Sequence, residues 1–202
     1  MRRAVLVNGV PASGKSTVSN HLVRHLISRQ IAAVPLSLDT VKEGLFAHIG
    51  TGDRDHNRML GRASYHSIFA SIAAFPDSLV PVIDAWHGFQ PEAVLRAHLA
   101  RAEIALVVEV WCMVTPATAA QRYRKRAATR HSGHLPASYA DELFTLAGCA
   151  EPVGIGPVVG IDTEAPIDPS RLDAVAECLQ TDPADHGRFA ETSNRPKRSE
   201  DR

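Results

Sequence analysis

The sequence predicts an α/β fold built on a five-stranded parallel sheet with helices on both faces. Two observations support this prediction. Strand-like apolar runs alternate with helical stretches about five times along the chain, a pattern that produces parallel strands joined by right-handed crossovers. In addition, the first run leads into GVPASGKST at residues 9–17, where two glycines bracket four residues and lysine, serine and threonine follow at once. That spacing is typical of a P-loop between a strand and a helix.

The expected strands are short apolar segments. They cover residues 2–9, 32–39, 79–86, 104–114 and 157–163. The fourth segment, IALVVEVWCMV, lacks a regular alternation of apolar and polar residues, as expected for a parallel strand that is covered on both faces. Because ligands bind at the carboxyl ends of parallel strands, side chains that follow these segments are the candidates for function.

Helices are expected after the P-loop and between the later strands. The apolar residues after the P-loop recur at four-residue spacing, at Val18, Leu22 and Leu26. Thr115 precedes Pro116, and Asp168 precedes Pro169. A capping residue followed by proline is a helix start signal, so helices are predicted to begin at both places.

The region from residue 42 to 75 is longer than a simple crossover requires, and we expect it to form a substrate-binding arm. Its polar and aromatic candidates are Arg54, His56, Arg58, Arg62, Tyr65 and His66. Residues 1–180 are expected to form a single domain. Residues 181–202 are rich in polar and charged residues and are expected to be a disordered tail.

Composition restricts the partner and the compartment. The chain has 202 residues, with 22 lysines and arginines against 22 aspartates and glutamates. No bulk field therefore attracts nucleic acid or an anionic membrane, and a small or neutral partner fits better. The three cysteines are widely spaced, without the close pairs of a metal site or a disulfide framework. With no apolar run of membrane-spanning length and no cleavable leader at the basic start, a cytoplasmic protein is expected.

The P-loop is expected to bind ATP together with Mg²⁺. Its backbone N–H groups should surround the phosphates, helped by the positive end of the following helix. Lys15 would neutralise the β and γ phosphates, and Ser16 would offer its hydroxyl to Mg²⁺. The expected nucleotide-binding residues of the loop are Gly9, Pro11, Ala12, Ser13, Gly14, Lys15, Ser16 and Thr17. A glycine-rich turn that merely contains a lysine is the alternative.

Two aspartates end neighbouring segments of the predicted sheet. Asp39 closes the second segment and Asp84 ends the third strand, so both side chains should point into the crevice beside the P-loop. One acid linked to a metal and one acid facing a nucleophile would explain the pair. Taken alone, each aspartate is also a common helix cap or turn residue.

Arginines follow the fourth strand at helical spacing. Arg122, Arg126 and Arg130 lie four residues apart on one face, with Arg124 and Lys125 beside them. A solvated basic face is the usual origin of such a run. This run, however, lies where a lid would close over the triphosphate, and arginine suits the charge on a transferring phosphoryl group. We therefore expect a short lid in which Arg126 and Arg130 act on phosphate, with Arg122 also near the nucleotide.

Further side chains are candidates for the acceptor pocket. Trp86 and His87 follow Asp84 closely, although aromatic residues at a strand end often only pack. His131 and His134 form an HxxH pair, for which we expect a surface or substrate contact rather than zinc. The expected substrate-contacting residues are Asp39, Lys42, Arg62, Asp84, Trp86, His87 and His134.

Together these residues resemble the P-loop kinases of the adenylate-kinase-like group. Within it they resemble small-molecule kinases similar to chloramphenicol phosphotransferase, along with polynucleotide kinase and zeta-toxin relatives. The matching pieces are GVPASGKST, LSLDTVKEGL, VIDAW, RYRKRAATRH and GIDTEAP, which span residues 4 to about 180 in the family's order. The resemblance implies a P-loop NTPase fold of three α/β/α layers with a short lid. It also implies that Asp39 acts as base toward the acceptor hydroxyl and that Asp84 assists magnesium or substrate.

Two positions depart from the pattern of such kinases. Shikimate-kinase-like enzymes carry two acids, D-x-D, where this chain has Ser37 and Asp39, so shikimate is disfavoured. Many relatives have arginine where this chain has Lys42, which weakens a bidentate contact to phosphate or carboxylate there. An adenylate kinase proper is also disfavoured, because the lid is short and the nucleotide-acceptor pattern is not recognisable.

The expected function is transfer of the γ-phosphate of ATP, with Mg²⁺, to a hydroxyl of a small molecule such as a sugar, aminosugar or antibiotic. A kinase for nucleic-acid ends is an alternative, but it predicts a basic groove that zero net charge does not encourage. A nucleotide-dependent switch that drives partner binding is another alternative. It would need switch elements that respond to γ-phosphate, and the sequence has no convincing GTPase base-recognition motif.

Overall fold

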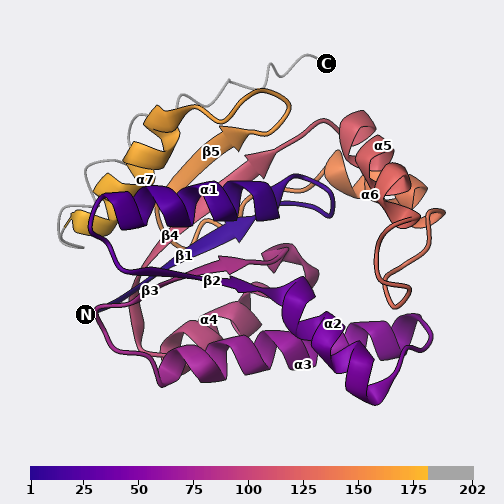
Figure 1. Cartoon of the computed structure of the whole chain (residues 1–202), viewed down its shortest axis with the longest axis horizontal. Coiled ribbons are helices and arrows are strands. Elements are labelled where there is room, and N and C mark those ends of the chain that lie inside the picture. Colours follow the sequence, from indigo (N-terminus) through magenta and orange to yellow (C-terminus); the bar gives the residue numbers. More distant parts are fainter. Residues whose placement is uncertain (182–202) are drawn as a thin grey trace, which may run out of the picture.

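Five parallel strands form one sheet at the centre of the structure, in the order β2-β3-β1-β4-β5 (Figure 1). The computed structural model describes residues 1–181. The strands are β1 (Arg2–Asn8), β2 (Ala33–Ser37), β3 (Val80–Asp84), β4 (Ile104–Met113) and β5 (Val158–Asp162). All four neighbouring pairs are parallel, which confirms the predicted α/β class.

Helices cover both faces of the sheet and give the three predicted layers (Figure 1). One face is covered by α1 (Lys15–Ser28) and α7 (Pro169–Gln180), and the other by α3 (Arg54–Ala73) and α4 (Glu92–Arg101). The remaining helical elements are α2 (Leu38–Ile49), the 3-10 turn η1 (His87–Phe89), α5 (Pro116–Ala127) and α6 (Tyr139–Ala147).

Strand β4 illustrates why these apolar segments fold as central strands. Val107 belongs to the core cluster under α3 and α4, whereas Val108 belongs to the cluster under α1 and α7. Both side chains are buried. Because each face of the strand meets a helical layer, apolar residues are needed on both faces, and the alternation seen in half-exposed strands is lost.

Two helix starts confirm the predicted caps. Thr115 accepts a hydrogen bond from the backbone N–H of Thr118 at 3.3 Å, and Asp168 accepts one from the N–H of Ser170 at 2.9 Å. Proline occupies the first turn of both α5 and α7. Its fixed φ suits that turn, and its missing N–H has no intrahelical partner to lose there.

The second strand is shorter than predicted. It ends at Ser37, whose hydroxyl oxygen accepts a hydrogen bond from the backbone N–H of Thr40 at 3.4 Å and caps α2. A serine that can satisfy a helix N–H favours a helix start over continued strand pairing. Asp39 therefore lies in the first turn of α2, not at the end of a strand.

The predicted short lid is a pair of helices next to the P-loop. Helices α5 and α6 pack together through a small apolar cluster that includes Tyr123, Leu143 and Val10 of the P-loop. This cluster attaches the lid to the loop that it was expected to cover.

No helix within residues 1–181 is long and apolar enough to cross a membrane. Cys112, Cys149 and Cys178 are free thiols. The predicted disordered tail, residues 181–202, lies outside the described residues except for Thr181.

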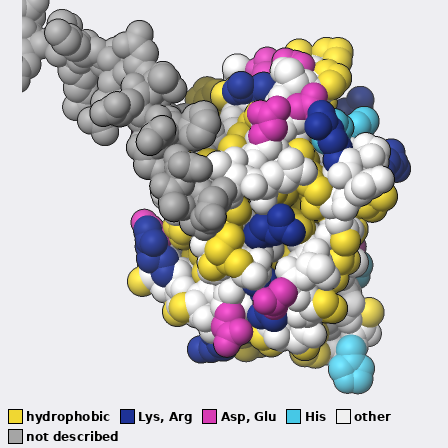
Figure 2. Space-filling model, turned by 90° about the vertical axis from the view of Figure 1, so that its left-hand side faces the viewer, with side chains coloured by type: hydrophobic (Ala, Val, Ile, Leu, Met, Phe, Trp, Pro, Cys, Tyr) yellow, Lys and Arg dark blue, Asp and Glu magenta, His cyan; other side chains and the backbone are white. Residues whose placement is uncertain are grey.

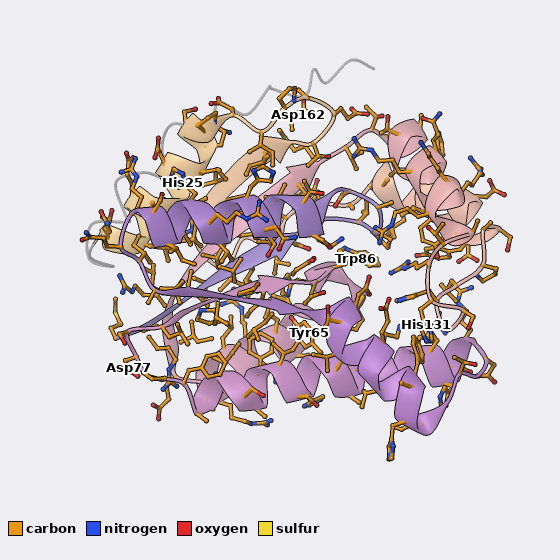
Figure 3. The ribbon with its side chains drawn as sticks, viewed as in Figure 1. His25, Tyr65, Asp77, Trp86, His131 and Asp162 are labelled. Atoms are coloured by element: carbon orange, nitrogen blue, oxygen red, sulfur yellow. The ribbon has the colours of Figure 1, made fainter. Side chains whose placement is uncertain are left out.

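The face on the left of Figure 1 carries charges of both signs. Figure 2 shows lysine and arginine side chains interspersed with acidic and apolar ones on this face. Asp77, which Figure 3 labels on this side of the structure, is paired with the buried Arg2 across 3.1 Å. A surface on which both signs are mixed generates no strong field of a single sign.

Candidate active site

A cleft of about 550 Å³ opens beside the P-loop, at the carboxyl edge of the sheet. Its walls come from the P-loop, the end of β3, and helices α2, α3, α5 and α6. Ligands of open α/β sheets bind at this edge. The predicted site residues that line it are Pro11, Ala12, Gly14, Lys15, Ser16, Thr17, Asp39, Lys42, Arg62, Asp84, Trp86, Arg126, Arg130 and His134.

The P-loop has the backbone geometry of an anion cradle. Gly9 has a φ of 149° and Gly14 a φ of 86°, values that favour glycine. A Cβ at Gly9 would lie 2.5 Å from Ser13 Oγ, so Gly9 and the buried Ser13 shape the loop from inside and do not line the cleft. Helix α1 starts directly after Gly14 without a side-chain cap. Its first N–H groups are therefore available to the oxygens of a phosphate.

Lys15 and Ser16 begin α1 at the mouth of the loop. The Lys15 ammonium donates hydrogen bonds to the carbonyl oxygens of Gly9 and Val10, both at 2.8 Å. Burial lowers the pKa of Lys15, and the negative charge of Asp84 opposes this only in part. The Ser16 hydroxyl donates a hydrogen bond to Asp84 Oδ2 at 2.6 Å.

Asp84 ends β3, as predicted, and is 7% exposed. Burial raises its pKa despite the opposing effects of Lys15 and Ser16. A hydroxyl and a carboxylate in contact beside a phosphate cradle fit Mg²⁺, which takes few protein ligands and completes its shell with water and phosphate oxygens. Within residues 1–181, no group of three or more His, Cys, Asp or Glu side chains could hold a metal by itself.

Asp39 forms an ion pair with the lid. Arg130 donates a hydrogen bond to Asp39 Oδ2 at 2.5 Å. Burial raises the pKa of Asp39, but the positive charge of Arg130, with smaller contributions from His134 and Lys15, outweighs it and holds the pKa below its usual value. The carboxylate is therefore ionised at neutral pH. The two predicted acids thus have different partners, the P-loop serine for Asp84 and a lid arginine for Asp39.

The lid loop, residues 128–138 between α5 and α6, packs against α2. The His131 ring stacks on Phe46 with centroids 5.1 Å apart, and His134 meets the same ring edge-on at 5.7 Å (Figure 3). His134 Nε2 also lies 2.7 Å from Glu43 Oε1. The HxxH pair therefore fastens the lid loop to α2, and His134 lines the cleft as predicted.

His87 does not line the cleft, contrary to prediction. It is 2% exposed, and its Nδ1 lies 2.7 Å from the Tyr65 hydroxyl oxygen, in the core between the sheet and α3. Its backbone N–H is held by the side chain of Asn8 at 2.9 Å, at the start of η1, and its ring is buried. Burial lowers the pKa of His87 to about 3, so the ring is neutral. Trp86, one residue earlier, does line the cleft (Figure 3).

Arg122 is separated from the other two lid arginines. Its guanidinium donates hydrogen bonds to the Thr163 carbonyl oxygen at 2.7 Å and hydroxyl oxygen at 3.2 Å. Thr163 in turn packs against the P-loop, since a Cβ at Gly14 would lie 3.2 Å from the Thr163 Cβ. Arg122 thus braces the segment after β5, whereas Arg126 and Arg130 line the cleft.

A buried polar network behind the P-loop was not predicted. The Asn8 amide donates a hydrogen bond to Glu109 Oε1 at 2.7 Å, and its carbonyl oxygen accepts one from the N–H of Gly9 at 2.8 Å. Glu109 also accepts hydrogen bonds from two backbone N–H groups in the loop before β5. A signal was present in the sequence, because Glu109 interrupts the apolar run of β4 and Asn8 directly follows the apolar residues 4–7 of β1. Both side chains are almost fully buried. Buried polar groups require partners.

Comparison with known proteins assigns the chain to a family. The sequence pattern of a family described as "AAA domain" matches residues 5–143, from β1 into α6. The chain belongs to this family. The matched part of the AAA domain includes the P-loop, both carboxylates and the lid arginines. A search among curated proteins finds no match.

Solved structures share the fold of this AAA domain. A protein from Chloroflexus aurantiacus described as a candidate kinase gives a TM-score of 0.69 at 23% identity, over 87% of this chain and 95% of its own. The APS kinase CysC of Mycobacterium tuberculosis, in complex with AMPPNP and APS, gives 0.60 at 21% identity, over 89% and 98%. Kti12 from Chaetomium thermophilum, in complex with ADP-AlF3, gives 0.60 at 15% identity, over 88% and 100%. At these identities the likeness establishes the predicted P-loop NTPase fold.

Proposed function

We propose that this AAA domain is an ATP- and Mg²⁺-dependent phosphotransferase that transfers the γ-phosphate to a hydroxyl group of a small molecule. One observation carries the proposal: the cleft beside the P-loop holds two carboxylates with different partners. Asp84 contacts the P-loop serine, where a nucleotide-bound metal would be held. Asp39 is on α2 and contacts the lid instead, so it is free of the metal position and suited to an acceptor.

The P-loop residues fit the phosphates of ATP with Mg²⁺. The N–H groups at the start of α1 and the Lys15 ammonium would bind the β and γ phosphates. Ser16 and Asp84 would hold the ion, which neutralises charge on the transferring group when bound. Two structures of the same fold support this choice, since one contains AMPPNP with APS and another contains ADP-AlF3.

Asp39 is suited to act as general base. Its carboxylate would accept the proton of the acceptor hydroxyl while that oxygen bonds to the γ-phosphorus and the bond to the leaving oxygen of ADP breaks. Arg130 would exchange Asp39 for phosphate oxygens as the substrates bind. Arg126, exposed on α5, would add positive charge as negative charge moves onto ADP. The products are ADP and a phosphorylated acceptor, with the proton on Asp39.

The proposal is tested by comparing Asp39→Asn with Asp84→Asn. Asparagine keeps the side-chain shape and removes the charge. Calorimetric titration of ATP at several magnesium concentrations, together with single-turnover transfer, separates the two roles. We expect Asp39→Asn to bind ATP normally and to transfer phosphate about 10²- to 10⁴-fold more slowly. Asp84→Asn should need more magnesium for ATP binding, since its role is to hold the ion.

Asp141→Asn is a matched control, because Asp141 is exposed on α6 and outside the cleft. It should behave as the wild type in both assays. Wild-type transfer by Asp39→Asn would exclude the base. ATP hydrolysis that no sugar, aminosugar, antibiotic or other hydroxyl compound accelerates would favour the nucleotide-dependent switch. Phosphorylation of only a 5′-hydroxyl oligonucleotide would favour the nucleic-acid-end kinase.

A further inference from the structure

We infer that the acceptor carries an anionic group, such as a phosphate, sulfate or carboxylate, which Lys42 and Arg62 bind on one wall of the cleft. This wall, the α2–α3 wall, is formed by the cleft-lining residues of the two helices, four of them basic and one acidic: Leu38, Asp39 and Lys42 on α2, and Arg54, Asn57, Arg58, Gly61 and Arg62 on α3. The two helices pack side by side (Figure 1). Both helices line the cleft. That the bound anion belongs to an acceptor rests on the proposed function, whereas the anion site itself rests on the contacts described below.

Lys42 is a buried cation without an acidic partner. It is 8% exposed, and its ammonium donates a hydrogen bond to the neutral amide oxygen of Asn57 at 2.7 Å. The ring of Phe46, 5.5 Å away, gives a further weak contact. In the described part of the chain Lys42 forms no ion pair, and the nearby Asp39, whose negative charge acts on Lys42 from a distance, is paired with Arg130. A buried ammonium is costly without a compensating charge, which an anion in the cleft would supply.

Gly61 leaves space open beside Lys42. It lies inside the 20-residue helix α3, where glycine costs about 1 kcal/mol relative to alanine. A Cβ at this position would meet only Lys42, at 3.8 Å from Nζ and 4.0 Å from Cε. Packing within the protein therefore does not require a glycine here. The open space lies in the cleft wall and gives an anion access to the ammonium.

Arginines extend the positive charge of the wall along α3. Arg58 and Arg62 are one helical turn apart, and both line the cleft. Arg58 forms an ion pair with Asp55 at 3.2 Å, whereas Arg62 has no ion pair among residues 1–181. A guanidinium can bind phosphate or carboxylate through two parallel hydrogen bonds. Lys42 and Arg62 thus place on the same wall two positive charges that form no ion pair within residues 1–181.

The charges of the whole cleft agree with this assignment, because seven lysines and arginines line it against three acidic residues. The basic residues are Lys15, Lys42, Arg54, Arg58, Arg62, Arg126 and Arg130, and the acidic ones are Asp39, Asp84 and Glu142. The basic residues at the P-loop and lid, Lys15, Arg126 and Arg130, lie where the phosphates of ATP are expected. The surplus on the α2–α3 wall is left for a second anion. A neutral sugar would leave it uncompensated, and a cationic aminosugar would be repelled.

A small anion fits this wall better than a nucleic acid does. Toward the start of α3 the positive charge is reduced, because Arg54 is paired with Glu142 at 2.6 Å and Arg58 with Asp55. A nucleic acid would be expected to need a basic stripe that continues past the cleft. The cleft volume, about 550 Å³, is within the range of small-molecule sites.

Inorganic phosphate tests the site without turnover. With AMPPNP and Mg²⁺ saturating the P-loop, calorimetry should detect one phosphate bound per wild-type chain. Lys42→Met removes the charge and Gly61→Leu fills the space, so each should weaken phosphate binding about tenfold or more. Gly44→Leu on α2 is the matched control, because a Cβ there meets no atom within 4 Å and Gly44 is outside the cleft. It should bind phosphate as the wild type does, and AMPPNP affinity should be unchanged in all variants.

Equal phosphate binding by the wild type, Lys42→Met and Gly61→Leu would overturn the site, as would a wild type that binds no phosphate. Matched acceptors then test the substrate class: ribose against ribose 5-phosphate, glucose against gluconate, and a 5′-hydroxyl oligonucleotide. We expect transfer to an anionic small molecule, with its KM raised about tenfold in Arg62→Gln and the KM for ATP unchanged. Preference for the neutral compounds or for the oligonucleotide would contradict the inference. If the wild type binds phosphate but transfers phosphate to none of the acceptors, the proposed function is wrong and the anion site stands.

Discussion

Glu109→Gln should destabilise the fold, because it disrupts the buried network behind the P-loop. Glu109 is 1% exposed. Its Oε1 accepts hydrogen bonds from the Asn8 amide at 2.7 Å and the Val153 N–H at 2.9 Å, and its Oε2 accepts one from the Gly154 N–H at 2.7 Å. Glutamine has one acceptor oxygen in place of two. In either orientation the glutamine NH₂ group faces an N–H donor, and that donor loses the hydrogen bond that it makes to Glu109 in the wild type.

The size of the destabilisation follows from the glutamine orientation that loses the fewest hydrogen bonds. If the glutamine oxygen takes the place of Oε1, two hydrogen bonds survive and only the Gly154 N–H loses its acceptor. A hydrogen bond to a charged acceptor contributes about 1.5–3 kcal/mol, and an unsatisfied buried donor costs about 1–3 kcal/mol. Relief of the buried charge offsets part of this loss. We expect the free energy of unfolding to fall by about 2–4 kcal/mol.

Equilibrium unfolding in urea measures this change. Glu177→Gln is the matched control, since Glu177 is exposed on α7, and it should stay within about 0.5 kcal/mol of the wild type. Because Asn8 holds both Glu109 and the N–H of Gly9, the glutamine variant should also bind ATP more weakly. A Glu109→Gln protein that unfolds at the wild-type urea concentration would refute the stabilising role of the network.

Three other substitutions probe the charged groups of the cleft. Asp84→Asn should raise the free energy of unfolding without nucleotide by about 1 kcal/mol, because burial raises the Asp84 pKa and so disfavours its ionised form at neutral pH. Arg126→Ala should lower kcat more than it raises the acceptor KM, and lysine should rescue it poorly, since the charge acts mainly during transfer. His134→Gln should flatten the loss of stability below about pH 6.5, because burial lowers the His134 pKa and the unfolded state takes the proton first.

A different outcome would contradict each of these three expectations. For Asp84→Asn, a lower midpoint of thermal unfolding than the wild type would show that its contacts with Ser16 and Lys15 outweigh the cost of burial. For Arg126→Ala, a kcat equal to that of the wild type would show that Arg126 belongs to a solvated helix face and has no role in transfer. For His134→Gln, the free energy of unfolding is measured in urea at several pH values. A decrease between pH 7 and 5 as steep as that of the wild type would exclude a contribution from His134.

Features set by neighbouring residues could be predicted from the sequence. The P-loop, the caps at Thr115 and Asp168, and the buried strand β4 depend on residues within a few positions of one another, and the structure confirms them. The end of β2 also depends on local residues, but it was predicted wrongly. The apolar run continues through Leu38, but Ser37 caps the helix that begins there and so ends the strand.

Contacts between distant segments could not be predicted in the same way. Asp39 and Arg130 are 91 positions apart, and only the packing of the lid loop on α2 brings them together. His87 turns inward because Asn8 holds its backbone and Tyr65 meets its ring, and neither partner adjoins it in sequence. Arg122 shares a helical face with Arg126, yet Thr163, from the segment after β5, engages it.

The overall charge of the chain favoured a small or neutral partner, whereas we propose a small anionic one for the cleft, and the difference has a physical origin. Equal numbers of basic and acidic residues cancel the field at long range, where salt screens it further. Two acidic residues outside the cleft, Glu92 and Asp141, are paired with arginines, Arg96 and Arg124. Lys42 faces the cleft without such a partner. Inside a cleft the nearest charges dominate, so a chain of zero net charge can hold a positive site.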